Sequence, residues 1–282
     1  MHSNTPMAHT FARRISPLPV QMLRVGWIML AVLALLLSAR RIAMAADTAK
    51  PPVPVLIELF TSEGCSSCPP ADDLLARLDG QPIPGVRAIV LSEHVTYWNQ
   101  DGWHDPFSLD AITDRQREYG SRFNLNDVYT PQAVVDGAAQ VVGSNGEKLG
   151  NAILQAAAAP KADLAIASAQ WSGGAMQFVL HGGVNPDANV FAALAEDSEQ
   201  INVLRGENGG RTLHHVAVVR TIEKLGKASA DAGGPLGGKT LSVRLPANKE
   251  VKDSGSLRLV VFLANRRNGH VVALAEQTVP RS

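Results

Sequence analysis

Cysteine is scarce in this sequence, with only Cys65 and Cys68 among its 282 residues. A bridge between them closes a very small loop, and the stabilisation that a disulfide gives to a fold grows with the length of that loop. Disulfides therefore do not hold this fold together, and the pair is available for chemistry.

Long hydrophobic runs are also missing. The apolar run Val25–Leu37 has about 13 residues, fewer than the roughly 20 that cross a bilayer as a helix. Hydrophobic residues nevertheless make up 45% of the chain, which is enough for a packed core. This composition excludes both a disordered chain and a polytopic membrane protein.

Acidic residues are absent from residues 1–45, which contain five arginines. The basic stretch, the apolar run after it and the small-residue pattern Ala43-Met44-Ala45 predict a secretory signal peptide over 1–45. Arg40 and Arg41 lie close to the cleavage point, so an uncleaved N-terminal anchor is the alternative. We expect a periplasmic or secreted protein, in a compartment where disulfides persist, with no membrane contact after cleavage.

The remaining chain has no excess of positive charge. Without the five arginines, 21 Lys and Arg stand against 26 Asp and Glu, a net charge of −5. This balance gives no electrostatic attraction to nucleic acid, so we expect no nucleic-acid partner. We also expect no cofactor and no resident metal.

Strand and helix signals alternate between residues 47 and 160. The predicted elements are strands Val53–Phe60 and Val86–Ser92, helices Pro69–Asp79 and Ser108–Phe123, a hairpin of Gln132–Asp136 and Ala138–Gly143, and a helix ending near Ala159. Ser108 and the capping box Ser144-Asn145-Gly146-Glu147 predict where the last two helices begin. The order βα, βα, ββ, α is the minimal thioredoxin topology, which predicts an α/β thioredoxin-like domain over 47–160.

The second half carries only strand signals. Seven short runs are separated by Gly-rich or Pro-bearing breaks: Leu164–Trp171, Ala175–His181, Val190–Ala195, Leu213–Ile222, Leu241–Leu245, Leu257–Ala264 and Val271–Thr278. This pattern predicts an all-β, sandwich-like domain over 163–282. Pro160 and Lys161 mark the expected boundary, and we predict that the two domains are separate structural units.

The cysteine pair lies directly after a predicted buried strand and directly before a predicted helix. The N–H groups and positive dipole of a helix N-terminus stabilise a thiolate, which is the attacking species in thiol exchange. A second cysteine two residues further on can resolve a mixed disulfide without large motion. The pattern therefore favours redox activity over an inert disulfide or half of a metal site.

Two neighbours limit how reactive the predicted thiolate is. Pro69-Pro70 removes N–H groups near the start of the helix, and the Glu63 carboxylate opposes a second negative charge nearby. We therefore expect a modest lowering of the thiol pKa. We also expect Cys65, at the turn, to be more exposed than Cys68 and to react first.

Thr130-Pro131 immediately precedes the predicted hairpin. In a thioredoxin topology this position holds a cis-proline that faces the cysteines and presents a backbone edge to a peptide. We therefore expect Pro131 to belong to the catalytic site and Thr130 to the substrate contact. An ordinary trans proline at the start of a strand is the alternative.

The segment 93–107 follows the second predicted strand and is rich in aromatic residues and histidines. Ligands gather at the carboxyl ends of parallel strands, where the cysteine turn also lies. We predict that His94, Tyr97, Trp98 and Trp103 line a substrate wall or, for His94, relay protons. The alternative is a loop core covered by the second half of the chain.

Two further features have structural interpretations. Arg205–Arg211 is a charged, Gly-rich turn that fits a hairpin loop with an internal ion pair better than an anion site. His214 and His215 point to opposite faces if they lie on one strand, so they are not expected to bind one metal.

The run from Ile57 to Asp72, which includes both cysteines, resembles a motif of a secreted bacterial family, domain of unknown function 1223 (DUF1223). The resemblance continues through His94, Tyr97-Trp98, Gly102-Trp103, Asp105-Pro106-Phe107, Tyr129-Thr130-Pro131-Gln132, Arg205-Gly206-Glu207-Asn208 and Arg211. It implies a thioredoxin-like fold and export, but no established reaction. Thr96 stands where we expect an acidic residue, so the resemblance supplies no acid beside His94.

The leading hypothesis is a thiol–disulfide oxidoreductase in which Cys65 attacks and Cys68 resolves. Its partner would be a disulfide-containing or dithiol protein, as substrate or redox partner. A copper(I)-handling protein that uses Cys65, Cys68 and His94 as ligands is one alternative. The other is a binding module whose β-rich half recognises a partner while the disulfide stays inert.

Overall fold

The computed structural model of the chain describes residues 29–30, 32–36, 51–182, 187–228, 238–245 and 256–279. Pro52–Ser282 form one compact unit and Met1–Pro51 another. The predicted cleavage pattern at residues 43–45 lies outside the described residues. In the parts of the chain that are described, no helix has the length and apolar character needed to cross a membrane.

The first half contains the predicted elements in the predicted order. They are β1 (Val53–Thr61), α2 (Pro69–Gly80), β2 (Val86–His94), α3 (Asp110–Arg122), β3 (Gln132–Val135), β4 (Ala139–Val142) and α4 (Gly146–Ala158). β1 pairs in parallel with β2, from Val53 opposite Val86 to Thr61 opposite His94, and antiparallel with β3. Asp136 and Gly137 both have positive φ, as a tight hairpin turn requires.

The second half contains all seven predicted strands. They are β5 (Leu164–Ser172), β6 (Ala175–Gly182), β7 (Ala188–Asn202), β8 (Thr212–Lys227), β9 (Leu241–Arg244), β10 (Leu257–Asn265) and β11 (Val271–Val279). β7 and β8 are much longer than predicted, with 15 and 16 residues. They form an antiparallel hairpin that begins at the pair Asn202 and Thr212.

The predicted division into two separate domains is wrong. A single sheet of eight strands runs through both halves in the order β11-β10-β7-β8-β2-β1-β3-β4. The junction is a parallel pairing of β2 with β8, at Ser92 and Val218. The physical reason is that β2 would otherwise be an edge strand with unpaired backbone groups, which β8 covers.

The residues of the predicted boundary take part in the fold on both sides. Lys161 Nζ lies 2.7 Å from Asp136 Oδ2, and both side chains are buried. The next residue, Ala162, forms a β-bridge with Ala273 of the last strand. A buried ion pair and a bridge to β11 therefore stand where the sequence predicts a linker.

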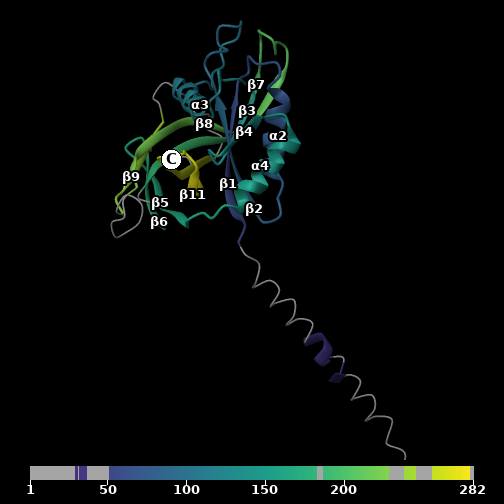
Figure 1. The fold of residues 1–282 in the computed structure, drawn as a ribbon, viewed down its shortest axis with the longest axis vertical. Helices are drawn as coiled ribbons and strands as arrows, with labels where there is room; N and C mark the ends of the chain where they lie inside the picture. The colour runs from purple at the N-terminus through teal and green to yellow at the C-terminus, as the bar shows by residue number, and fades with distance from the viewer. Residues whose placement is uncertain are drawn as a thin grey trace, which may run out of the picture. The chain divides into compact units, whose positions relative to one another are not determined.

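The helices cover the two faces of the first half of the sheet. α2 and α4 lie on one face and α3 on the other (Figure 1). Gly146 at the start of α4 packs beside the Leu74 side chain of α2. One hydrophobic core joins β1, β2 and β3 to side chains of β8 and β10 such as Val219 and Phe262.

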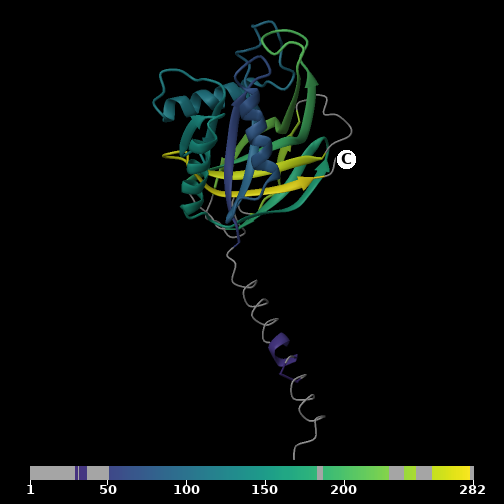
Figure 2. The ribbon, with the colours of Figure 1, turned by 90° about the vertical axis from the view of Figure 1, so that its right-hand side faces the viewer.

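The predicted sandwich is present as packing between two sheets, although it is not a separate domain. A three-stranded sheet in the order β5-β6-β9 packs its β6 side chains, Met176, Phe178 and Leu180, against β7 and β10. Figure 2 shows β10 and β11, in yellow, side by side in the large sheet. The large sheet therefore belongs both to the α/β half and to the sandwich.

Candidate active site

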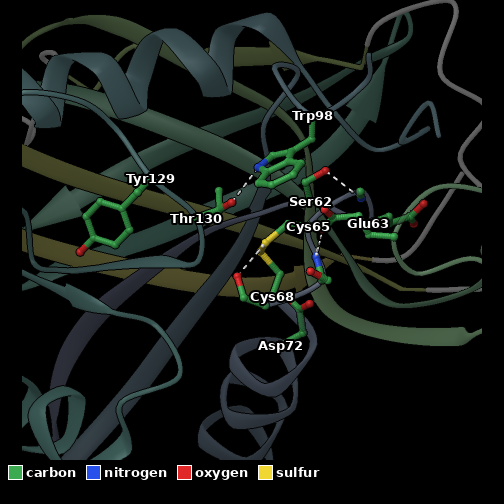
Figure 3. Close-up of a disulfide and its surroundings, with 12 residues drawn as sticks. Ser62, Glu63, Cys65, Cys68, Asp72, Trp98, Tyr129 and Thr130 are labelled. Atoms are coloured by element: carbon green, nitrogen blue, oxygen red, sulfur yellow. Dashed lines mark hydrogen bonds between the residues drawn. A yellow bond between two sulfur atoms is a disulfide. The ribbon is translucent and has the colours of Figure 1, made fainter. Parts of the chain in front are cut away.

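The cysteine turn, residues 62–68, connects β1 to α2. Cys65 N–H donates to the Ser62 carbonyl and Cys68 N–H to the Cys65 carbonyl, each at 3.1 Å. Cys68 is the N-cap of α2, where its carbonyl accepts from the N–H groups of Ala71 and Asp72. The two prolines that follow occupy the first helical positions, where a missing N–H leaves no bond unmade. Cys65 and Cys68 form a disulfide (Figure 3).

Both cysteines have 0% of their surface exposed. The predicted difference in exposure between Cys65 and Cys68 is therefore absent from this structure. Ser66 and Ser67, between them, are exposed, and the Ser67 hydroxyl lies 3.4 Å from Cys65 Sγ. The disulfide is covered by segments from elsewhere in the chain.

One covering segment includes the start of the β3 hairpin. The Thr130–Pro131 peptide is cis, as predicted, and Pro131 is buried. The Trp98 indole N–H donates to the Thr130 hydroxyl at 2.8 Å, and both side chains lie beside the disulfide (Figure 3). A Cβ on Gly64 would meet Trp98 Cβ at 3.2 Å, so Trp98 packs directly against the cysteine turn.

Asp105 ties the loop 93–107 to the same turn. Its Oδ2 accepts the Glu63 N–H at 3.0 Å and lies 2.7 Å from His94 Nδ1, while Oδ1 accepts the Phe107 N–H. His94 therefore does have an acidic partner, eleven residues further along, which the substitution at Thr96 had led us not to expect. His94 is 1% exposed and offers no surface to a substrate, so it acts by positioning the loop.

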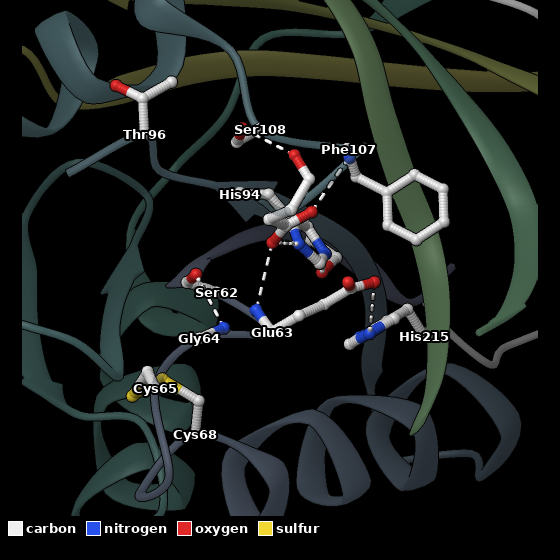
Figure 4. Close-up of polar contacts among 12 residues, drawn as sticks. Ser62, Glu63, Gly64, Cys65, Cys68, His94, Thr96, Phe107, Ser108 and His215 are labelled. Carbon is white, nitrogen blue, oxygen red and sulfur yellow. Dashed lines mark hydrogen bonds and ion pairs between the residues drawn. A yellow bond between two sulfur atoms is a disulfide. The ribbon is translucent and has the colours of Figure 1, made fainter. Parts of the chain in front are cut away.

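Glu63, Asp72 and His215 form a buried polar cluster behind the disulfide. The Trp103 indole N–H donates to Glu63 Oε2 at 2.6 Å. Glu63 Oε1 lies 3.7 Å from His215 Nε2 (Figure 4), and His215 Nδ1 lies 3.9 Å from Asp72 Oδ1. None of these four atoms has a hydrogen-bond partner among the described residues. Sequence patterns do not predict this role of His215, because its partners Glu63 and Asp72 come from the cysteine turn and from α2.

Burial controls the protonation of this cluster. It raises the pKa of Glu63 to about 7 and that of Asp72 to about 7, and lowers the pKa of His215 to about 3. Burial also disfavours the charged form of His94, but the Asp105 carboxylate outweighs it and raises the pKa of His94. His94 and Asp105 therefore favour their charged forms, while near neutral pH His215 is neutral and Glu63 and Asp72 are each about half ionised.

The β7–β8 hairpin reaches the cysteine turn from the second half of the chain. Asn208 Nδ2 donates to the carbonyls of Glu63 and Cys65 at 2.8 and 3.0 Å. Arg211 Nη1 donates to Asn208 Oδ1, and Glu207 Oε2 accepts the Ser66 N–H at 3.1 Å. The predicted hairpin loop is present, but its Glu207 and Asn208 side chains bind the backbone of the cysteine turn. Sequence analysis did not predict this contact. The one signal that groups these residues with the cysteines is their shared place in the DUF1223-like pattern.

The remaining predicted residue, Tyr97, faces α3. Its hydroxyl donates to Gln116 Oε1 at 3.1 Å, and burial raises the pKa of Tyr97 to about 12. The structure thus brings Trp98 and Thr130 beside the disulfide, with the cis-proline Pro131 next to Thr130 in the chain, and it connects Trp103 to the turn through Glu63. Tyr97 and His94 support the loop from behind.

The side chains around the disulfide do not form a metal-ligand set. Among the described residues, no three His, Cys, Asp or Glu side chains are grouped so that they could hold a metal ion. The His94 ring nitrogens lie within hydrogen-bond distance of Ser92 and Asp105. The three ligands of the copper hypothesis therefore do not converge.

Comparisons with known proteins concern the family and the fold. The profile of the family described as "Protein of unknown function (DUF1223)" matches residues 56–264. The crystal structure of protein AGR_C_4864 from Agrobacterium tumefaciens has 25% identity and a TM-score of 0.57, and the match covers 82% of this chain and 96% of that one. HBP35 of Porphyromonas gingivalis has 13% identity and a TM-score of 0.50, with 82% and 77% covered, which concerns the fold alone. A search of curated proteins finds no match.

Proposed function

Because the chain belongs to the DUF1223 family, whose function is unknown, its activity has to be inferred from its own site, and we propose that it is an exported thiol–disulfide oxidoreductase with a thioredoxin-like first half. The observation that carries the proposal is the Cys65–Cys68 disulfide at the junction of β1 and the N-terminus of α2. The order of β1, α2, β2, α3, β3, β4 and α4, with Pro131 starting the hairpin, supports the thioredoxin-like part.

The chemistry of this proposal needs only thiols and a disulfide. A thiolate of a partner dithiol attacks Cys65 Sγ, the Cys65–Cys68 bond breaks, and Cys68 leaves as a thiolate that takes up a proton. The second thiol of the partner then attacks its own sulfur in the mixed disulfide and releases Cys65. The partner is oxidised and this protein is reduced; the reverse sequence oxidises the protein.

The electrostatics of the turn favour such exchange near neutral pH. A thiolate at Cys65 or Cys68 lies at the positive end of the α2 dipole. Glu63 was expected to oppose it, but burial raises the pKa of Glu63 to about 7, so the carboxyl is uncharged at lower pH. The Glu63 carboxylate therefore repels a cysteine thiolate only as the pH rises through about 7.

Trapping of the mixed disulfide tests the proposal. A Cys68→Ser variant, incubated with an unfolded model protein that carries a disulfide, should accumulate a covalent adduct at Cys65. The matched variant Cys65→Ser should give much less adduct at Cys68. Equal trapping by the two variants would refute the assigned roles, and trapping by neither would refute the activity.

A binding module with an inert disulfide is the second candidate, because neither cysteine has exposed surface. The reduction potential separates the two. Structural disulfides of secreted proteins have potentials below about −300 mV, whereas exchange-active ones are more oxidising. A value well above this limit supports the oxidoreductase, and one below it supports the binding module.

A further inference from the structure

We propose that the tip of the β7–β8 hairpin, residues 203–211, is a clasp that occupies the position of an extended substrate peptide beside Cys65 and is displaced when such a peptide binds. The inference rests on the proposed function, for which it names the form of the substrate and the way it reaches the disulfide. Its first support is that both sulfurs are fully covered although the serines between them are exposed.

Asn208 is the centre of the clasp. Its side chain is fully buried, and its amide donates to two main-chain carbonyls of the cysteine turn, those of Glu63 and Cys65. Arg211 donates to the amide oxygen, which fixes the orientation of the NH2 group toward the turn. The contact therefore joins the Asn208 side chain, from the second half of the chain, to main-chain carbonyls of the first half.

Glu207 completes the pattern on the outside. Its carboxylate accepts the N–H of Ser66, the residue that follows Cys65. The clasp thus gives the turn a donor at the Cys65 carbonyl and an acceptor at the Ser66 N–H. An extended peptide offers the same two groups through its own N–H and C=O, which is how peptides add to exposed backbone edges. The clasp therefore fills places that a peptide backbone can take over.

The clasp is built to move as one body. Within it, Val203 N–H donates to the Arg211 carbonyl and Gly210 N–H to the Val203 carbonyl, so it keeps its own shape. Apart from its hydrogen bonds to the cysteine turn, the clasp also packs against the loop 93–107 at Gly206. A Cβ on Gly206 would lie 3.1 Å from the Asp101 carbonyl oxygen and 3.2 Å from Trp103 Cβ. Most of its residues are exposed.

The opposite wall of the disulfide is less free to open. Trp98 donates to the Thr130 hydroxyl, packs its Cβ against Gly64 and lies against the hydrophobic core of the first half. Opening that wall requires the hydrophobic core to separate. Opening the clasp breaks the two buried hydrogen bonds of Asn208 and the exposed one of Glu207 but separates no hydrophobic core, so we assign access to the clasp.

The rate at which dithiothreitol reduces the disulfide in the full-length protein tests whether the clasp limits access. Asn208→Ala removes two hydrogen bonds and should speed reduction about tenfold, equivalent to about 1.4 kcal/mol of opening free energy. The exposed substitution Glu207→Ala, which removes the acceptor of the Ser66 N–H, should speed it about two- to fivefold relative to Glu207→Gln, which removes the charge but keeps an acceptor. Asn151→Ala and Glu118→Ala, at exposed helix positions, are matched controls and should leave the rate unchanged.

These rates do not involve a protein substrate, so they separate this inference from the proposed function. Faster reduction of Asn208→Ala and Glu207→Ala without any trapping of proteins by Cys68→Ser keeps the clasp and refutes the oxidoreductase. Equal rates for Glu207→Ala and Glu207→Gln, which change an exposed side chain, overturn the clasp whether or not Asn208→Ala folds.

A second measurement tests whether the clasp occupies the peptide position. In reduced Cys68→Ser protein, Cys65 can displace thionitrobenzoate from an activated cysteine-containing peptide, or from activated mercaptoethanol, to give a peptide or a small adduct. Trypsin should cleave after Arg205 and Arg211 several times faster in the peptide adduct than in the small adduct. Equal cleavage rates in the two adducts overturn the assignment of the peptide to this position.

Discussion

Glu63 and Asp72 give the site its unusual electrostatics, because both carboxyl groups are buried and each has an oxygen without a hydrogen-bond partner among the described residues. Their protonated forms are favoured in the folded protein, while in the unfolded chain both ionise near pH 4. Each therefore stabilises the fold fully below about pH 4, and this contribution is lost as the pH rises through about 7.

Asp72→Asn should reduce the dependence of stability on pH. The wild-type free energy of unfolding should fall between pH 5 and pH 8 by about 2–3 kcal/mol more than that of the variant, because the range from pH 5 to the Asp72 pKa of about 7 spans about two pKa units, each worth about 1.4 kcal/mol. Urea unfolding at the two pH values measures this difference. Asp73→Asn, the exposed neighbour on α2, is the control and should behave like wild type. Parallel pH profiles of wild type and Asp72→Asn would contradict the assignment.

Residue identity predicted some of these roles and missed others. Cys65, Cys68 and Pro131 stand out because their chemistry and their place between elements are visible in the sequence. Asp105 does not, because an acidic residue in a loop can pair with any of its neighbours. Its selection of His94 and the Glu63 N–H follows from how the loop folds back on β1.

At the scale of elements, the helix starts show how side chains choose between local and distant partners. Ser108 was predicted to cap α3, but its hydroxyl donates to the Asp105 carbonyl, and α3 begins at Asp110 without a side-chain cap. α4 is capped by Asn145, through the Lys148 N–H, although a capping box predicted Ser144. The apolar face from Leu109 to Phe123 located α3 and the Ala-rich composition located α4, because such patterns extend over many residues, whereas a cap depends on one bond.

Two glycine substitutions test how tightly the elements around the site pack. In Gly143→Ala the new Cβ would lie 2.6 Å from Leu59 Cδ1 and 3.3 Å from Pro131 Cβ. We expect a loss of about 1–3 kcal/mol in the free energy of unfolding. Gly150→Ala, inside α4 with no atom within 4 Å of the new Cβ, should gain about 0.5–1 kcal/mol. Urea unfolding measures both, and a Gly143→Ala protein as stable as wild type would contradict the close packing of Gly143, just after β4, against Leu59 and Pro131.

At the scale of the whole molecule, the two halves share contacts that strand patterns cannot reveal. A strand signal states that a segment is extended and buried, but not which strand lies beside it. Arg258 of β10 binds Asp79 of α2 through two hydrogen bonds across 179 positions. Arg115 of α3 lies over the rings of Phe191 and Phe262 from β7 and β10. The composition change near residue 160 marks a change of architecture within one folded unit.

We therefore expect the described body to unfold as one cooperative unit. Near-UV circular dichroism and tryptophan fluorescence report on Trp98 and Trp103 in the first half and Trp171 in the second, and far-UV dichroism reports on both sheets. Their urea transitions should coincide, which is the test of a single transition. A fragment of residues 52–160 should not fold, since it exposes the edge of β2 and leaves Arg115 without its two phenylalanine rings. Two resolved transitions, or a fragment with native near-UV dichroism, would show that the first half is an independent domain after all.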